Sequence, residues 1–166
     1  MQGPTRTREE YDDTEDVLRR MAELVRDYRS DPAVRDVGAS IVRRVDEEDP
    51  GQVARAVWAW IVEKIQYVLD PAGVELLQSP DVTLQKGYGD CDDLSVLAAA
   101  ILSAVGVDAG FRAVAQIEAG EYDHVYVIYW DQGAWRELDP IDPERPPPGP
   151  IYTDVESTLN LHINDD

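Results

Sequence analysis

The stretch from Gly89 to Gly106 constrains the fold more than any other part of the sequence. Asp90 suits the N-cap of a helix, because its carboxylate can accept a hydrogen bond from the first turn. Asp93 falls three residues later, where an acid can complete a capping box. Gly106 suits the left-handed position after a helix. Apolar residues recur between these ends at helical spacing: Leu94, Leu97, Ala98, Ile101, Leu102 and Val105. The stretch therefore predicts a buried helix with Cys91 in its first turn.

Cys91 is the only cysteine, which excludes an intrachain disulfide and a cysteine-rich metal site. A helix N-terminus lowers the pKa of a thiol, and this is the first requirement for a nucleophilic cysteine. The flanking Asp90 and Asp92 act in the opposite direction, since negative charge raises a thiol pKa. A lone cysteine is more often an inert buried residue. A catalytic role for Cys91 therefore depends on partners elsewhere in the chain.

Length and charge limit the classes of function. A chain of 166 residues is expected to form one domain with a substantial core. A net charge of −19 disfavours nucleic acid and anionic membranes as partners. No apolar run approaches the ~18 residues of a membrane span, and no secretory signal is visible. A cytoplasmic or virion-associated protein is expected, and the acidic composition also fits a halophilic source.

The chain divides into helices followed by strands. Apolar stripes predict helices over residues 13–30, 31–45 and 52–65, and residues 74–85 are expected to be irregular, interrupted at Ser79-Pro80. After Gly106 the apolar period changes to two, which predicts strands at 111–117, 124–130 and 135–138. Residues 143–150 form a proline-rich connector, and Leu159, Leu161 and Ile163 alternate as in an edge strand.

This order predicts an α+β fold in which N-terminal helices precede a cysteine-bearing helix packed on an antiparallel β-meander. Residues 1–12 are expected to be a flexible N-terminus. Residues 13–142 would form a single domain with its core at 50–142, and residues 143–166 would form the connector and tail.

A thiolate nucleophile needs a base and a group that orients the base. His124 opens one predicted strand, and Asp139 ends the next. Neighbouring antiparallel strands would place these two side chains together at the sheet rim, facing a helix N-terminus. His162 lies in the tail and is expected to be idle. A metal site made by Cys91, His124 and an aspartate lacks an evident fourth ligand, so no metal or cofactor is expected.

Three segments together resemble the core of the transglutaminase-like superfamily: Gly89-Asp90-Cys91-Asp92-Asp93, His124-Val125-Tyr126-Val127 and Trp135-Arg136-Glu137-Leu138-Asp139-Pro140. Two upstream segments, at residues 67–71 and 77–80, resemble bacterial and phage-encoded members. The resemblance covers about residues 50–142 and implies a papain-like fold. It also implies that Cys91 attacks an acyl carbon, that His124 takes the thiol proton, and that Asp139 fixes the imidazole tautomer.

The resemblance also implies an oxyanion hole made in part by the backbone N–H of Cys91. Gln85 lies six residues before the cysteine, a separation similar to that in papain-type proteases, where a glutamine completes the hole. Many transglutaminase relatives use an upstream tryptophan, and this chain has none close before Cys91. Tyr88 is the alternative second donor.

Two functions follow from these observations. The first is cysteine-dependent acyl transfer, as the hydrolysis of an amide or peptide bond in a peptide or protein substrate through a thioester. The second is a structural module of the same fold, for instance in the assembly of a phage particle, with little or no catalysis.

Overall fold

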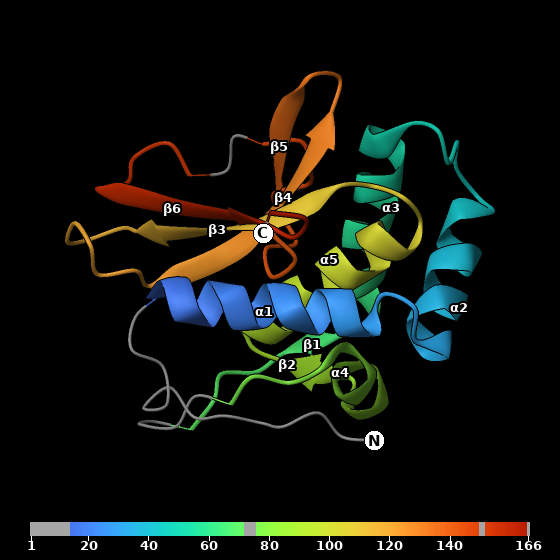
Figure 1. Cartoon of the computed structure of the whole chain (residues 1–166), viewed down its shortest axis with the longest axis horizontal. Coiled ribbons are helices and arrows are strands. Elements are labelled where there is room, and N and C mark those ends of the chain that lie inside the picture. Colours follow the sequence, from blue (N-terminus) through green and yellow to red (C-terminus); the bar gives the residue numbers. More distant parts are fainter. Residues whose placement is uncertain (1–13, 72–75, 150–151, 166) are drawn as a thin grey trace.

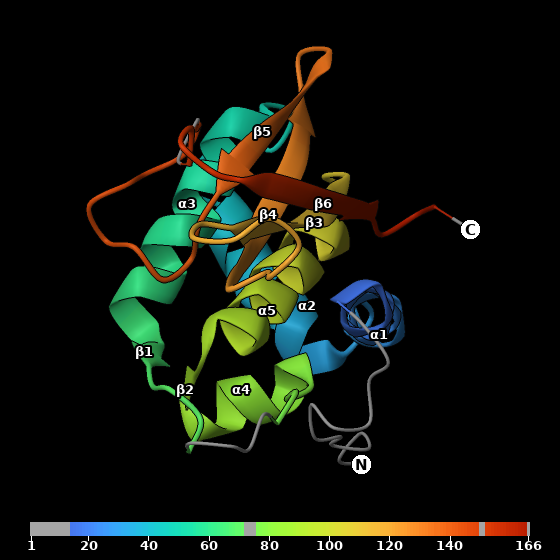
Figure 2. The ribbon, with the colours of Figure 1, turned by 90° about the vertical axis from the view of Figure 1, so that its left-hand side faces the viewer.

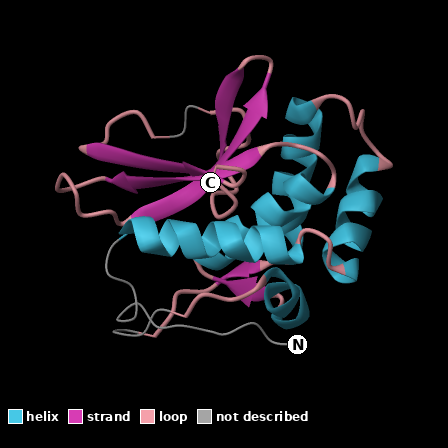
Figure 3. Ribbon diagram, viewed as in Figure 1, coloured by secondary structure: helices cyan, strands magenta, loops and turns pink. Residues whose placement is uncertain are grey.

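The computed structural model describes residues 14–71, 76–149 and 152–165, and it has the predicted α+β organisation (Figure 3). The helices are α1 (Thr14–Tyr28), α2 (Pro32–Val42), α3 (Pro50–Lys64), α4 (Pro80–Lys86) and α5 (Cys91–Ala104). The strands are β1 (Gln66–Tyr67), β2 (Tyr88–Gly89), β3 (Ala109–Ala115), β4 (His124–Asp131), β5 (Ala134–Leu138) and β6 (Ser157–His162). The three helices expected before residue 66 are all present.

Side-chain caps explain where α2 and α3 begin. Asp31 precedes α2 and accepts hydrogen bonds from the backbone N–H groups of Ala33 and Val34. Asp49 precedes α3 and accepts one from Gln52. Each cap is followed by a proline, whose missing N–H is not needed in the first turn. Local sequence is thus sufficient to set both helix starts.

The segment before the cysteine helix differs from the prediction. Residues 74–85 were expected to be irregular and interrupted at Ser79-Pro80, but α4 begins at Pro80. Ser79 occupies the N-cap position, and Pro80 stands where proline is tolerated because its nitrogen needs no partner. Ser79-Pro80 is therefore a helix start. Residues 72–75, which include the first two residues of this segment, lie outside the described residues.

Helix α5 lies at the centre of the molecule (Figures 1 and 2). It contacts the four other helices and the strands β3 and β4. Its residues from Asp92 to Leu102 are all buried, as expected for a helix that is apolar on nearly every side. Gly106, just beyond its end, has a φ of 89°, the predicted left-handed conformation.

The main sheet is antiparallel, with strand order β5-β4-β3-β6. The predicted meander corresponds to β3, β4 and β5. The edge strand expected near the C-terminus is β6, and it pairs with β3, where Phe111 lies opposite Leu161. The chain therefore crosses from one edge of the sheet to the other between β5 and β6 (Figure 1). Residues assigned from sequence to a tail thus complete the sheet.

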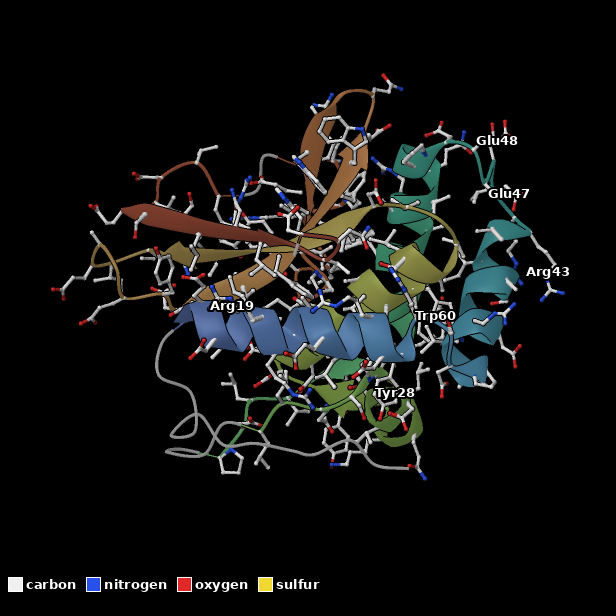
Figure 4. The ribbon with its side chains drawn as sticks, viewed as in Figure 1. Arg19, Tyr28, Arg43, Glu47, Glu48 and Trp60 are labelled. Carbon is white, nitrogen blue, oxygen red and sulfur yellow. The ribbon has the colours of Figure 1, made fainter. Side chains whose placement is uncertain are left out.

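Charged side chains point outward from the molecule, as Figure 4 shows for Arg19 on α1 and for Arg43, Glu47 and Glu48 in the connection between α2 and α3. Arg19 pairs with Glu15 one turn earlier on α1. Such exposed pairs contribute little to stability, because water screens them. In the part of the chain that the structure describes, no helix combines the length and apolar character that crossing a bilayer would need.

Candidate active site

The start of α5 is fixed by the predicted capping box. Asp90 Oδ1 accepts hydrogen bonds from the backbone N–H groups of Asp92 (3.1 Å) and Asp93 (3.2 Å). Asp93 Oδ2 accepts one in return from the backbone N–H of Asp90 (3.1 Å). Cys91 is therefore the first residue of the helix, and its side chain is half-buried.

The thiol of Cys91 faces the beginning of β4. Ser95 lies one turn later on the same face of α5, and its hydroxyl donates to the carbonyl oxygen of Val125 at 3.4 Å. A backbone hydrogen bond from Val125 to the sulfur lowers the pKa of the Cys91 thiol. Because Val125 directly follows His124, these contacts bring the thiol to the strand end that carries His124.

His124 is paired with Asp139, at the rim of the sheet where the sequence placed both. Nε2 of His124 lies 2.8 Å from Oδ2 of Asp139, and the two side chains are 8% and 0% exposed. The carboxylate also accepts the backbone N–H of Ile141 at Oδ1 (3.1 Å). An ionised carboxylate accepts hydrogen bonds only, so Nε2 carries the proton and Nδ1 is left as the basic nitrogen.

Tyr152 belongs to this site, although no sequence signal indicated it. Its hydroxyl donates to Oδ2 of Asp139 at 2.9 Å. Its ring lies edge-on to the imidazole of His124, with centroids 5.3 Å apart, and contacts the ring of Tyr126 at 5.2 Å. Tyr152 lies in the connection between β5 and β6. This connection crosses the sheet and places the Tyr152 ring against His124.

Tyr67 is a second residue that the sequence analysis left without a role. The parallel pairing of β1 with β2 places it opposite Gly89, two residues before Cys91. Burial raises the pKa of Tyr67 to about 12, and electrostatic interaction with Cys91, Asp90, Asp139 and Asp92 adds to the effect. The Tyr67 hydroxyl therefore lies in the electrostatic field of the thiol and of the Asp139 carboxylate.

The two residues predicted as second oxyanion donors lie before the cysteine helix. Gln85 is exposed near the end of α4. Tyr88 is the first residue of β2, is 43% exposed, and has the ammonium group of Lys86 5.9 Å from its ring centroid. The backbone N–H of Cys91 is in the first turn of α5, where N–H groups have no partner within the helix.

Burial and nearby negative charges oppose ionisation of the Cys91 thiol in the folded protein. Burial raises the pKa of Cys91 well above its usual range, and the charges of Asp92 and Asp90 raise it further. Sγ lies 3.6 Å from Oδ1 of Asp92. At neutral pH the thiol is therefore protonated, and its activation requires proton transfer to a base during the reaction.

Gln78 makes hydrogen bonds to the residues around the start of α5. The sequence analysis did not indicate this contact. Its backbone N–H donates to Oδ1 of Asp93 (2.7 Å), and its amide nitrogen donates to Oδ2 of Asp93 (2.9 Å) and to the carbonyl of Tyr88 (3.1 Å). Space here is tight, because a Cβ on Gly89 would lie 2.6 Å from Cβ of Asp93. Only glycine fits at that position, two residues before the thiol.

The described residues contain one group with the spacing of metal ligands. Carboxylate oxygens of Asp70, Asp90 and Asp93 all lie within 4.8 Å of one another. Burial raises the pKa of both Asp90 and Asp93. For Asp90 the charges of Asp93, Asp92 and Asp70 add to this effect. This group differs from the combination of Cys91, His124 and an aspartate that the sequence analysis considered.

The sequence of residues 35–140 matches the model of the transglutaminase-like superfamily. This match covers more than half of the chain and contains the cysteine helix and the strands that carry His124 and Asp139. The chain belongs to the transglutaminase-like superfamily. The match begins within α2, upstream of the core expected at residue 50. No curated protein matches the sequence significantly.

Several solved structures share the fold at low sequence identity. A proposed protease from Parabacteroides distasonis has a TM-score of 0.67 at 11% identity, over 94% of this chain and 30% of that one. LapG from Legionella pneumophila, treated with EGTA, has a TM-score of 0.58 at 17% identity, over 83% and 77%. A proposed cysteine protease from Cytophaga hutchinsonii has a TM-score of 0.50 at 17% identity, over 65% and 36%.

These likenesses confirm the predicted fold. Because the chain covers only 30% and 36% of the two proposed proteases, they establish the shared domain and nothing about the rest of those proteins. The family and its structural neighbours support the predicted papain-like fold for this chain.

Proposed function

We propose that the protein is a cysteine-dependent enzyme that hydrolyses an amide or peptide bond in a polypeptide substrate, with Cys91, His124 and Asp139 as its triad. One observation carries the proposal. The imidazole of His124 is hydrogen-bonded to a fully buried carboxylate at 2.8 Å, on the strand end that the Cys91 thiol contacts through Val125. The structural neighbours described as proteases support a protein substrate.

In the first half of the reaction, Nδ1 of His124 takes the Sγ proton as the sulfur attacks the substrate carbonyl carbon. The C–N bond then breaks, the imidazolium returns its proton to the leaving amine, and a thioester to Cys91 remains. In the second half, water attacks the thioester as His124 removes its proton, and the thiol regains a proton as it leaves. Asp139 stabilises the imidazolium in both halves.

The developing oxyanion needs fixed hydrogen-bond donors. The backbone N–H of Cys91 is one proposed donor, and the side chain of Gln85 or of Tyr88 is the second. Losing one such donor typically costs ~3 kcal/mol of barrier. The variants Gln85→Ala and Tyr88→Phe separate the two proposals, because the change that removes the true donor lowers kcat while leaving the folded state intact.

The direct test is to incubate the folded protein with a peptide library and to identify new amino termini by mass spectrometry. We expect cleavage by the wild-type protein and none by Cys91→Ala or His124→Ala. Ser40→Ala on α2 is a matched control, since it removes a side-chain oxygen elsewhere. New termini that persist in Cys91→Ala, or a folded wild-type protein that cleaves nothing, would contradict the proposal.

A second candidate function is a binding or assembly module with an idle triad, for instance in a phage particle. The raised pKa of the Cys91 thiol favours it, because a protonated thiol is a poor nucleophile. The assembly hypothesis predicts that Cys91→Ala co-purifies with a larger assembly as fully as the wild-type protein does. A requirement for the thiol in that assay would exclude it.

A further inference from the structure

A cavity of about 610 Å³ opens beside the start of α5, and none of the proposed triad residues lines it. We call it the acidic pocket. Its apolar wall is formed by four aliphatic side chains, which are Val68, Leu69, Leu76 and Val82. Three of them are substantially exposed: Val68 at 39%, Leu69 at 73% and Leu76 at 36%. Aliphatic surface kept open to solvent around a cavity is typical of a ligand site.

Acidic side chains gather at one end of this pocket. Asp70 and Asp93 line it, and their oxygens lie within 4.8 Å of those of Asp90. Carboxyl groups held this close disfavour one another's ionisation, and burial of Asp90 and Asp93 adds to the effect. A positive group between them would stabilise their charged forms.

A second observation points to a hydrogen-bond donor as the missing partner. Gln78 also lines the pocket and is only 8% exposed. Its amide nitrogen is used by Asp93 and by the carbonyl of Tyr88, but its oxygen Oε1 has no hydrogen-bond partner within the described residues. A buried acceptor left unpaired costs about 1–3 kcal/mol, so a ligand N–H that reaches it would be favoured.

The remaining wall favours an organic cation over a bare metal ion. An aliphatic wall suits the methylene stem of a lysine or arginine side chain, whose charged head then reaches the carboxylates. The ring of Tyr88 offers a face for a cation, and the ammonium of Lys86 already lies 5.9 Å from its centroid. A metal ion would use the carboxylates but none of this apolar surface.

We propose that the acidic pocket binds the arginine or lysine side chain of a polypeptide substrate. The proposal rests on the proposed function only in calling that polypeptide the substrate. Val68 lines the pocket, and Tyr67 next to it is paired with Gly89 and lies in the electrostatic field of the thiol. Gly89 and Asp93, which lie two residues before and after Cys91, both line the pocket, so the bound basic residue would lie near the scissile bond and not at it.

The test uses the full chain with Cys91→Ala, which separates binding from chemistry. Amide NMR signals are followed while acetyl-arginine methylamide is added, with acetyl-norleucine methylamide as the uncharged control and calcium chloride as the metal probe. We expect the arginine compound to shift the amides of Val68, Leu76 and Gly89. Norleucine should shift them far less. Asp70→Asn should weaken arginine binding about tenfold, since a charge-assisted hydrogen bond is worth at least that much.

Further outcomes decide the chemistry of the ligand. Lys86→Gln removes the pocket's own cation and should leave arginine binding equal or tighter, whereas weaker binding would mean that the pocket takes an acidic group. Equal shifts with norleucine would overturn the proposal. Shifts with calcium chloride alone would also overturn it, because the carboxylates would then form a metal site. If arginine binds but the wild-type protein cleaves no peptide, the pocket stands and the proposed hydrolysis fails.

Discussion

The Cys91 thiol lies between groups that favour its thiolate and groups that oppose it. The helix N-terminus and the backbone N–H of Val125 favour the charge, while burial, Asp92 and Asp90 oppose it. The net effect is a raised pKa. The sequence showed the helix N-terminus, the flanking acids and a buried helix, but it did not show that β4 packs beside the thiol, whose burial is the largest cause of the shift.

This balance predicts how thiol reactivity depends on pH. Because the Cys91 pKa lies above its usual value of 9.0, the rate of alkylation by iodoacetamide should still rise beyond that pH. Asp92→Asn lowers this pKa and should increase the rate at pH 8, by about tenfold for each unit of pKa. Asp36→Asn on α2 removes an equal charge and should change nothing. A rate that levels off near pH 7 would show that the thiolate is instead stabilised.

The tautomer of His124 depends on Asp139. In Asp139→Asn the amide can offer an N–H to Nε2, so the proton should move to Nδ1, and the base that faces the thiol would be lost. We expect a kcat at least about 10³-fold lower with little change in stability. Nitrogen-15 NMR of the imidazole measures the tautomer directly. An unchanged tautomer with lost activity would mean that Asp139 acts by charge alone.

At the scale of elements, α5 depends on its own local sequence, whereas the place of β6 in the sheet depends on long-range pairing. Helix α5 is specified locally, since its capping box and apolar spacing lie within its own sequence. Strand β6 was recognisable by alternation, but its partner was not, because pairing with β3 requires the chain to cross the sheet. Helix α4 had a local signal in Ser79-Pro80 that was interpreted as an interruption.

The close contact of β3 with β6 can be tested at Gly110. A Cβ there would lie 2.7 Å from the backbone oxygen of Leu161, which cannot move away as a side-chain tip can. Gly110→Ala should therefore reduce the free energy of unfolding by about 1–3 kcal/mol, measured in urea. Gly51→Ala is the matched control, because its Cβ would meet the tip of Asp131 at 3.1 Å. Equal stability of the two variants would show that β6 pairs loosely.

At the scale of the whole molecule, a net charge of −19 on 166 residues implies strong self-repulsion in the compact state. Salt screens this repulsion, with a Debye length that falls from about 10 Å at 0.1 M to about 3 Å at 1 M. We expect the Tm to rise steadily with potassium chloride over that range, as a halophilic origin would require. A Tm that stays constant or falls would leave the acidic composition without that explanation.

The cysteine helix, the three-strand meander and the placement of His124 beside Asp139 could be predicted, because each depends on spacing within one segment or between adjacent strands. Tyr152, Gln78 and the acidic pocket could not. Tyr152 and Gln78 reach their partners from loops, and a loop has no periodicity that records which surface it will pack against. Short-range hydrogen bonding and apolar period thus specified the elements, while burial and long-range packing produced the environment of the thiol.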